Sequence, residues 1–338
     1  MCDCDNILPQ GLVEEKHYFN CKSIWKGDTV RYPDGTLCLQ NKNISDQTPD
    51  YLYHLSLGTD DDLKALFGDV KFVCTGGTEH RIRAFALYMA RLLNLPYSED
   101  HLVNLTATSK RYAMFKVGPV LAFNHGIGIP SMTTALQEVI KLLFHAKVKD
   151  PLIFRLGSSG GVGVEPGNVV ISAFGMNGLF EKNYISYVLG KERRYPSCLD
   201  ARLAQELQSM SSPDDGFETI IGGTLAADDY YRGQGRLDGP FCDYTEADKM
   251  AFLQKLRAAG VRNIEMEATA FAAFTHQAGV RAAIVCVALL NRFNGDQTHT
   301  MDPIKKFYTR FRYTQEILEK ALNATLRDHD TEEDIRRI

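Results

Sequence analysis

Short apolar runs alternate with stretches of helical spacing along the chain from about residue 51. Apolar runs bounded by turn residues predict strands, and the stretches with helical spacing predict helices. The predicted strands are 70–75, 112–117, 120–123, 152–156, 169–173, 261–264 and 281–290, and the predicted helices are 79–93, 133–146, 201–209, 246–259 and 268–278. Because runs such as 282–290 are apolar on both faces, the pattern predicts an α/β fold whose mostly parallel or mixed sheet is covered on both sides.

The chain shows one long patterned region with less regular ends. No composition shift or linker divides residues 51–325, so we predict a single catalytic domain there. Residues 1–50 lack sustained periodicity and carry glycines and prolines among polar residues, which predicts a loosely ordered N-terminal extension. Residues 326–338 are predicted to form a charged C-terminal tail.

Composition and charge narrow the class of protein. The chain is 44% hydrophobic and 24% charged, as soluble globular proteins usually are. A formal charge of −4 without blocks of like charge argues against a broad nucleic-acid-binding face. The longest apolar run has nine residues, whereas a membrane helix needs about 20. The first 20 residues hold acidic side chains and no apolar stretch, so we expect a cytosolic protein without a secretory signal.

The eight cysteines are scattered along the chain. The run Cys2-Asp3-Cys4 has no second Cys or His pair at zinc spacing. The sequence therefore predicts no metal site.

Two glycine-rich segments follow predicted strands, where open α/β sheets bind their ligands. Gly76-Gly77 leads into a helix that carries Arg81, and such a corner suits an anion, although a tight turn with a solvated arginine explains it too. Arg155 lies in an apolar strand, where an arginine is costly unless it pairs with an anion or carboxylate. The glycine run 157–163 is not a dinucleotide fingerprint, because its third glycine is displaced and Pro166 opposes a helix there.

Two further segments carry ring-binding and carboxylate side chains. The run 228–239 places Tyr230, Gln234 and Arg236 among glycines, as a platform for a planar carbonyl-rich ring or as a plain surface loop. Glu265 and Glu267 lie two residues apart at a strand end. Such carboxylates can accept hydrogen bonds from sugar hydroxyls. They can also stabilise a helix N-terminus by interacting with the helix dipole, or act as the acid and the nucleophile or base of a glycosidase.

Taken together, these segments resemble the uridine phosphorylases of the nucleoside phosphorylase family, most closely the animal forms. The resembling runs, in the family's order, are FGDVKFVC (67–74), RYAMF (111–115), HGIGIPS (125–131), YRGQGRLDG (231–239) and VRNIEME (261–267). The resemblance implies a single-domain nucleoside-phosphorylase fold with a central mixed sheet or barrel flanked by helices. It implies a pentosyltransferase of pyrimidine salvage or catabolism that splits uridine, with deoxyuridine as a further candidate, into uracil and (deoxy)ribose 1-phosphate. Inorganic phosphate is the co-substrate, no metal or organic cofactor is needed, and a homodimer shares its active sites between subunits.

The resemblance also assigns residue roles. Phosphate is expected at Gly77, Arg81, Arg111, Arg155 and Ser158, with Arg111 contributed by the neighbouring subunit. The uracil ring is expected at Ser159, Gly160, Tyr230, Gln234 and Arg236. The ribose is expected at His54, Glu265, Met266 and Glu267, with His54 reaching across the dimer interface. Arg292 and Asp296 match a loop that closes over the base, and the catalytic residues are expected to be Arg155, Gln234 and Arg236.

A few positions depart from the family's pattern. Ser158 stands where the family usually has Thr, Tyr230 where it has Phe, Arg232 where it has an acid, and Asp228 where it has an apolar residue. These departures keep the chemistry but bear on the choice among uridine, deoxyuridine and thymidine. The alternatives are a purine nucleoside phosphorylase, a hydrolytic nucleosidase, and a silent relative that only binds nucleoside.

Overall fold

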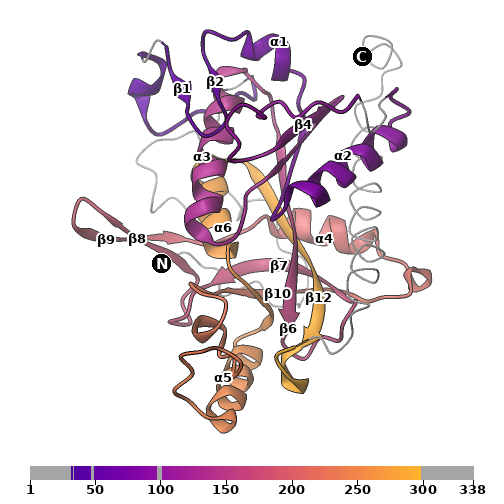
Figure 1. The fold of residues 1–338 in the computed structure, drawn as a ribbon, viewed down its shortest axis with the longest axis vertical. Coiled ribbons are helices and arrows are strands. Elements are labelled where there is room, and N and C mark those ends of the chain that lie inside the picture. The colour runs from indigo at the N-terminus through magenta and orange to yellow at the C-terminus, as the bar shows by residue number, and fades with distance from the viewer. Residues whose placement is uncertain (1–31, 33, 47–48, 97–100, 298–338) are drawn as a thin grey trace.

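A mixed sheet that closes on itself forms the centre of the structure, a computed structural model that describes residues 32, 34–46, 49–96 and 101–297 (Figure 1). Its strands are β3 (Phe72–Gly76), β4 (Met114–Val117), β5 (Val120–Asn124), β6 (Leu152–Gly161), β7 (Val169–Met176), β10 (Thr219–Ala226), β11 (Val261–Glu265) and β12 (Arg281–Asn291). The helices are α1 (Leu63–Phe67), α2 (Glu79–Leu92), α3 (Ile129–His145), α4 (Ala201–Ser209), α5 (Glu246–Ala258) and α6 (Ala268–Gln277).

The strand order is β11-β10-β7-β12-β6-β3-β5-β4, and β11 also pairs with β6. This extra pairing is antiparallel and joins Asn263 to Gly161 and Ile264 to Gly160. Strands β6, β12, β7, β10 and β11 therefore close into a five-strand barrel, while β3, β5 and β4 continue outward from β6. The predicted α/β fold with a central mixed sheet or barrel flanked by helices is confirmed.

Strand β6 is twice as long as the predicted strand 152–156, because it runs through the glycine segment to Gly161. It pairs in parallel with β12 along its whole length and with β3 as far as Thr75 and Arg155, and its last two residues pair with β11 in the barrel. Glycines let a strand bend and let other backbone approach closely, and a side chain on Gly161 would lie 2.2 Å from the Val164 carbonyl oxygen. Arg155 consequently lies inside the strand, at the point where its partner β3 ends.

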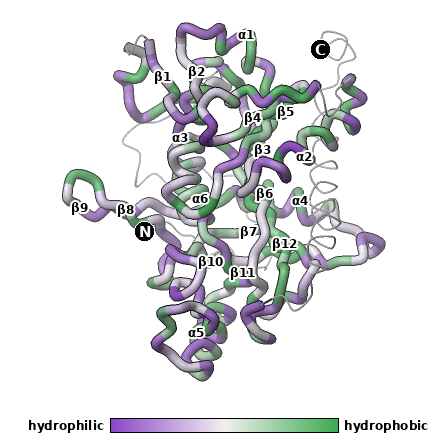
Figure 2. Tube along the Cα trace, in the orientation of Figure 1, coloured by the Kyte–Doolittle hydropathy of each residue, from purple (hydrophilic) through white to green (hydrophobic). Residues whose placement is uncertain are grey.

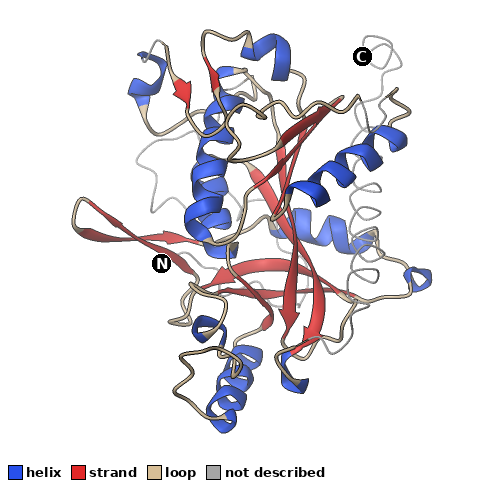
Figure 3. Ribbon diagram, viewed as in Figure 1, coloured by secondary structure: helices blue, strands red, loops and turns tan. Residues whose placement is uncertain are grey.

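Helices cover both faces of the sheet, as the two-sided apolar runs require (Figures 1 and 3). Alternate residues of β3, β5, β6 and β12 pack into two separate clusters, one with α3 and α6 and the other with α2 and α4. Strand β12 follows this rule, with Ile284 in the first cluster and Val285 in the second, and Figure 2 shows its hydrophobic colouring. The first cluster also contains Leu37 and Ile44, so part of the segment before residue 50 packs against the core.

Several of the shorter or irregular elements were not predicted from the sequence pattern. Strands β8 (Asn183–Val188) and β9 (Lys191–Pro196) form a separate antiparallel hairpin that projects from the body (Figure 3). The hairpin mixes charged and aromatic residues and lacks a buried face, so no clean alternation marks it. Strand β10 contains the pair Gly222-Gly223, which interrupts its apolar pattern. The short strands β1 (Tyr51–Leu52) and β2 (Leu57–Gly58) pair in a third sheet.

The predicted extension and tail fall largely outside the described residues, which leave out 1–31, 33, 47–48 and 298–338. Among the helices of the described residues, none has the length and apolar character that crossing a membrane requires. The same residues contain no group of three His, Cys, Asp or Glu side chains placed to hold a metal ion.

Candidate active site

Arg155 of β6 is the centre of a buried ion cluster and is 3% exposed. Its Nη2 atom lies 2.8 Å from Glu265 Oε2 and also contacts Glu267 Oε2, and its Nη1 atom lies 3.4 Å from the Cys286 sulfur. Burial opposes the charge on Arg155, but the two carboxylates outweigh it and raise the pKa of the guanidinium. The costly arginine in an apolar strand is therefore paired with carboxylates and stays charged.

The two carboxylates of this cluster lie in different environments. Glu265 accepts hydrogen bonds from the Glu267 and Ala268 backbone N–H groups, at 3.0 and 2.8 Å, and so caps α6. Burial raises the pKa of Glu265 to about 7 even though Arg155 opposes the shift. Burial acts on Glu267 in the same direction, but Arg155 and the hydrogen bond from the Gly128 backbone N–H hold its pKa below the usual value. The cluster thus keeps Glu267 as an anion at neutral pH, with oxygen lone pairs that can accept from a sugar hydroxyl.

Three of the remaining residues expected at phosphate lie on β6 or in the segment and helix that follow β3. Gly77 follows β3 and lies so close to Gly126 that a side chain there would sit 3.3 Å from the Gly126 carbonyl oxygen. Arg81 is half-buried in the first turn of α2, and Ser158 on β6 pairs in register with Val287 of β12. Arg111 is exposed, and its backbone N–H donates to Ser109 Oγ at 3.2 Å.

His54 lies in the turn between β1 and β2, and its side chain is 47% exposed. Its Nδ1 atom lies 2.7 Å from Glu138 Oε1 on α3. Glu138 also accepts the backbone N–H groups of His54 and Leu55, at 2.9 and 3.0 Å through Oε2. The imidazole is held at the surface with Nε2 directed away from Glu138.

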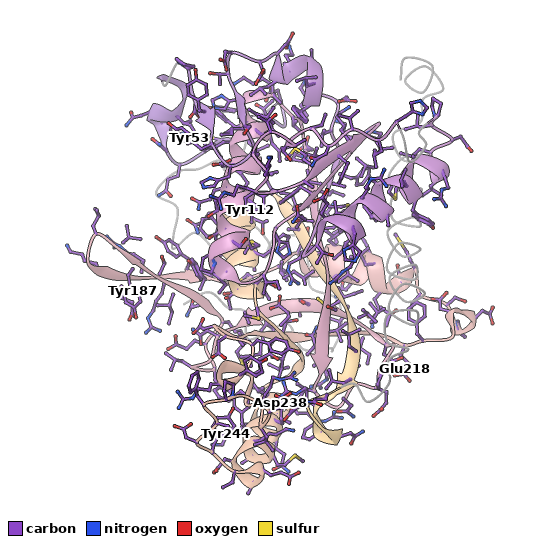
Figure 4. All side chains as sticks on the ribbon, in the orientation of Figure 1. Tyr53, Tyr112, Tyr187, Glu218, Asp238 and Tyr244 are labelled. Atoms are coloured by element: carbon purple, nitrogen blue, oxygen red, sulfur yellow. The ribbon has the colours of Figure 1, made fainter. Side chains whose placement is uncertain are left out.

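Gln234 and Arg236 are each 5% exposed and lie on the segment that follows β10. The Arg236 guanidinium forks onto Asp238, with Nε at 2.9 Å from Oδ1 and Nη2 at 2.8 Å from Oδ2. Its Nη2 also donates to the Asp296 carbonyl oxygen, and its central carbon lies 4.4 Å above the centre of the Tyr230 ring. Asp238 lies beside Tyr244, whose hydroxyl donates to the Arg236 carbonyl oxygen at 2.6 Å (Figure 4).

The segment after β12 closes onto these residues. Arg292 is fully buried, and its Nη2 donates to the Gln234 carbonyl oxygen at 2.9 Å. Asp296 holds the segment together by binding Arg292 Nη2 at 2.9 Å, Lys249 Nζ at 2.8 Å and the Leu237 backbone N–H at 2.9 Å. Gly160 leaves room for Arg292, because a side chain there would lie 2.9 Å from Arg292 Cγ and Cδ.

A buried polar chain inside the barrel supports Ser159. Asn263 Nδ2 donates to Ser159 Oγ at 3.0 Å, and Thr224 Oγ1 donates to Asn263 Oδ1 at 2.7 Å. Ser172 continues the chain at 2.5 Å from Thr224 Oγ1. Because buried networks with every member paired rigidify their surroundings, this chain fixes β6 against β7, β10 and β11.

The Arg155 cluster thus lies in the first half of β6 and at the carboxyl end of β11, and the Gln234–Arg236 segment follows β10, while Arg111 and His54 lie at the surface of the same chain. Sequence reasoning assigned no role to Asp238, Lys249 or Asn263, although Asp238 follows Arg236 at a spacing that suits a fork. No pattern in the sequence joins Lys249 to Asp296, because the two residues are far apart in the chain.

Fold and site together define an α/β enzyme with a buried arginine–carboxylate cluster and a hydrogen-bonded loop after β10, built around a small barrel. A family model described as the phosphorylase superfamily matches residues 71–323. The chain belongs to this phosphorylase superfamily, and the resemblance drawn from the sequence is confirmed.

Individual relatives show which members of the superfamily this chain resembles. The chain is 47% identical over 263 residues to "Uridine phosphorylase 1" of Mus musculus, covering 78% of this chain and 85% of the relative. It is 49% identical over 249 residues to "Uridine and thymidine phosphorylase" of Caenorhabditis elegans, covering 73% and 82% of the two chains. A solved uridine phosphorylase structure of Phytophthora capsici matches with a TM-score of 0.81 at 40% identity, over 86% of this chain and 99% of that chain.

One relative bears on catalysis. "Inactive uridine phosphorylase B" of Schistosoma mansoni is 38% identical over 270 residues, covering 79% of this chain and 90% of the relative. Membership of the family therefore leaves activity to be argued from the site itself.

Proposed function

We propose that this protein is a uridine phosphorylase, a pentosyltransferase that catalyses the reversible phosphorolysis of uridine to uracil and ribose 1-phosphate. One observation carries the proposal: a buried arginine–carboxylate cluster on β6 and around the end of β11 belongs to the same barrel whose strand β10 leads into Gln234 and Arg236, two further buried hydrogen-bonding side chains. The uridine phosphorylases among the relatives support the choice of substrate. Deoxyuridine is a second candidate, and the worm relative's name extends the candidates to thymidine.

The chemistry divides between the two groups of residues. Cleavage of the glycosidic bond develops positive charge on the ribose and negative charge on uracil. In the proposal, Gly77, Arg81, Arg155 and Ser158 hold phosphate below the sugar, so that a phosphate oxygen attacks C1′ with inversion as the bond to N1 breaks. Met266 and Glu267 position the ribose from the other side. Phosphate itself is the nucleophile, and burial raises the pKa of Cys286 to about 12, so this thiol stays protonated beside Arg155.

The uracil ring is the leaving group, and hydrogen bonds to its oxygens stabilise the departing anion. Asp238 and Asp296 occupy the Nε and Nη2 atoms of Arg236, which leaves Nη1 for the ring. Gln234 adds its side-chain amide from the same turn, and Ser159 and Gly160 of β6 line the ring from below. Preorganised donors aimed at developing charge make the largest single contribution in many enzymes. Arg236 is therefore the proposed centre of leaving-group stabilisation, with Arg292 and Asp296 closing the segment over the base.

We also propose a homodimer in which each site takes Arg111 and His54 from the neighbouring subunit. Both residues are exposed in the described structure, whereas Arg155 is buried. Large apolar side chains are exposed nearby and on the hairpin, with Tyr53 at 79%, Tyr187 at 76% and Leu189 at 96%. Tyr53 and Tyr187 lie on the same side of the molecule in Figure 4. Exposed apolar groups of this size favour an interface.

Subunit mixing tests the shared site. Arg111→Ala and Arg236→Ala homodimers should both be inactive. A one-to-one random mixture should recover about a quarter of wild-type activity, because half of the dimers then contain one intact site of two. A mixture as inactive as its components, at a ratio at which mass analysis shows mixed dimers, contradicts the sharing.

The reaction itself is tested by following uracil release from uridine with and without inorganic phosphate. Phosphate-dependent release that yields ribose 1-phosphate supports the proposal, whereas equal rates without phosphate identify a hydrolytic nucleosidase. The absence of turnover on both uridine and inosine, with nucleoside binding retained, identifies a silent relative. We propose that the enzyme works in the cytosol without a metal or organic cofactor, which fractionation and assays in chelator would check.

A further inference from the structure

Buried polar atoms of three residues lack hydrogen-bond partners at the carboxyl ends of β3 and β5 and on the adjoining part of β6. Within the described part of the chain, they are both ring nitrogens of His125, Nε of Arg155 and Oγ1 of Thr78. His125 directly follows β5, Thr78 follows β3 by two residues, and Arg155 lies on β6 where β3 ends. These three strands are neighbours in the sheet.

His125 is fixed in this place by its backbone. Its N–H donates to the Gly76 carbonyl oxygen at 2.8 Å, and the next residue, Gly126, adopts a φ of +73°, which turns the chain toward Gly128. The Gly128 N–H donates to Glu267 Oε1 at 2.5 Å, so the loop that carries His125 is attached to the carboxylate of the ion cluster. Arg155 and Glu267 are the charged side chains that act on the His125 ring.

Burying the His125 ring without hydrogen-bond partners costs free energy. His125 is 1% exposed, so water does not satisfy its nitrogens. Buried polar groups are hydrogen-bonded in the great majority of cases, and each exception needs an explanation. A core position with no polar task would be filled at lower free-energy cost by an apolar residue of similar shape. The unpaired nitrogens therefore point to a bound molecule that supplies their partner.

The imidazole is neutral in this environment. Burial lowers the pKa of His125 to about 4, and Arg155 acts in the same direction. A neutral imidazole carries one N–H donor and one acceptor nitrogen. It can therefore donate to a phosphate oxygen, or both donate to and accept from a hydroxyl group, without adding charge to the site.

We propose that His125 is a substrate-contacting residue of the phosphorolysis site, whose neutral ring hydrogen-bonds an oxygen atom of the bound pentose and phosphate pair. The inference rests on the proposed function and adds a residue to it. The contact lies between Arg155, assigned to phosphate, and Glu267, assigned to the ribose. The oxygen belongs either to phosphate or to a pentose hydroxyl, and kinetics separate the two sources.

The test replaces His125 by Leu, which keeps approximate volume and removes both nitrogens. The matched control is His276→Leu, because His276 in the last turn of α6 also has a buried ring nitrogen without a partner and a pKa lowered by burial. We expect His125→Leu to fold with unchanged circular dichroism and to lose about 10- to 100-fold in kcat/KM for uridine, the loss of one hydrogen bond to a polar or charged oxygen. His276→Leu should lose less than about threefold.

The substrate panel identifies the oxygen. If it belongs to phosphate, the KM for phosphate rises, and the loss is the same for uridine, 2′-deoxyuridine and 3′-deoxyuridine. If it belongs to a pentose hydroxyl, the KM for phosphate is unchanged, and the loss disappears for the nucleoside that lacks that hydroxyl. His125→Asn retains a donor and an acceptor, and it should recover part of the activity in either case.

Two outcomes overturn the inference. One is a loss in His125→Leu no greater than in His276→Leu. The other is a loss that matches a fall in folded fraction and is not relieved in His125→Asn. A ring ¹⁵N spectrum of the wild-type protein provides a second measurement, because phosphate or uridine should shift the His125 signals, and unchanged signals in the ligand-saturated protein contradict the contact. A wild-type enzyme without phosphorolytic activity defeats the proposed function instead, so the two failures are distinguishable.

Discussion

Replacing Arg236 by Ala should lower turnover of uridine far more than it lowers stability. The Nη1 atom of Arg236 is the donor that Asp238 and Asp296 leave unoccupied, and the fork onto Asp238 fixes its direction in advance. Loss of one preorganised donor at a developing negative charge costs about 2.7–4 kcal/mol, or roughly 10²- to 10³-fold in kcat. Because Asp238 keeps 22% of its side chain exposed, water solvates it once Arg236 is removed, and the stability loss should stay near about 1 kcal/mol.

Arg281→Ala is the matched control for this experiment. Arg281 begins β12, at the end of the strand opposite the site, and its Nε and Nη2 atoms pair with Asp200 and Glu206 at 2.5 and 3.3 Å. Its removal leaves Asp200, which is 2% exposed, without its cation, so it should cost about 1–3 kcal/mol of stability. We expect this variant to melt at a lower temperature and still turn over uridine within about threefold of wild type.

The assay compares uridine with 5-fluorouridine at saturating phosphate. Fluorine stabilises the departing uracil anion, so 5-fluorouridine depends less on Arg236, and Arg236→Ala should lose less activity on it than on uridine. Circular dichroism and thermal melting report the folded fraction of each variant. An equal loss on both nucleosides would falsify leaving-group stabilisation by Arg236 and leave only a role in ground-state binding.

Three further predictions concern the ion pairs of Asp50, the segment held by Asp296, and the role of Arg81 in phosphate binding. Asp50 lies 2.7 Å from a lysine and 2.8 Å from a histidine of α3, which together outweigh burial and lower its pKa, so Asp50→Asn should cost about 2 kcal/mol in urea unfolding at pH 7. Because the pKa of Asp50 is lowered in the folded protein, its carboxylate stabilises the fold at pH values above its ordinary pKa of 3.8. The difference in unfolding free energy between wild type and variant should therefore disappear as the pH falls below that value. A difference that stays constant with pH speaks against the ion pairs. Asp296→Ala frees Arg292 and Lys249 together and should raise the KM for uridine more than the KM for phosphate; steady-state kinetics showing equal rises would contradict a role confined to the base. Phosphate at 100 times its Kd should stabilise the wild type by about 2.7 kcal/mol in thermal melting, and Arg81→Ala should lose most of that gain at the same concentration; an unchanged gain would remove Arg81 from the phosphate site.

The fold class and most elements were predictable because burial leaves a local trace. Runs such as 282–290 are apolar at every position, and β12 is covered by helices on both faces as that pattern predicts. Helix α5 begins at Glu246, and its N-cap residue Thr245 exchanges hydrogen bonds with Asp248 in a capping box. Strand β6 was predicted too short, because glycines usually mark loops, and only its pairing with β12 and β11 explains a strand that continues through them.

The sequence by itself determined the chemical identities at the site: an arginine in an apolar strand, a Gln and an Arg among glycines, and two glutamates around a methionine. Only the tertiary structure decided which partners these side chains contact. It turns Glu265 toward the N-terminus of α6 while Glu267 faces the loop of His125, and it joins Asp296 to Lys249 and Arg236. It also leaves the His125 ring buried without a partner. The physical reason is that composition and local spacing fix which groups are present. Their burial, their hydrogen-bond partners and the atoms left without a partner depend on residues that the closure of the barrel brings together from distant parts of the chain.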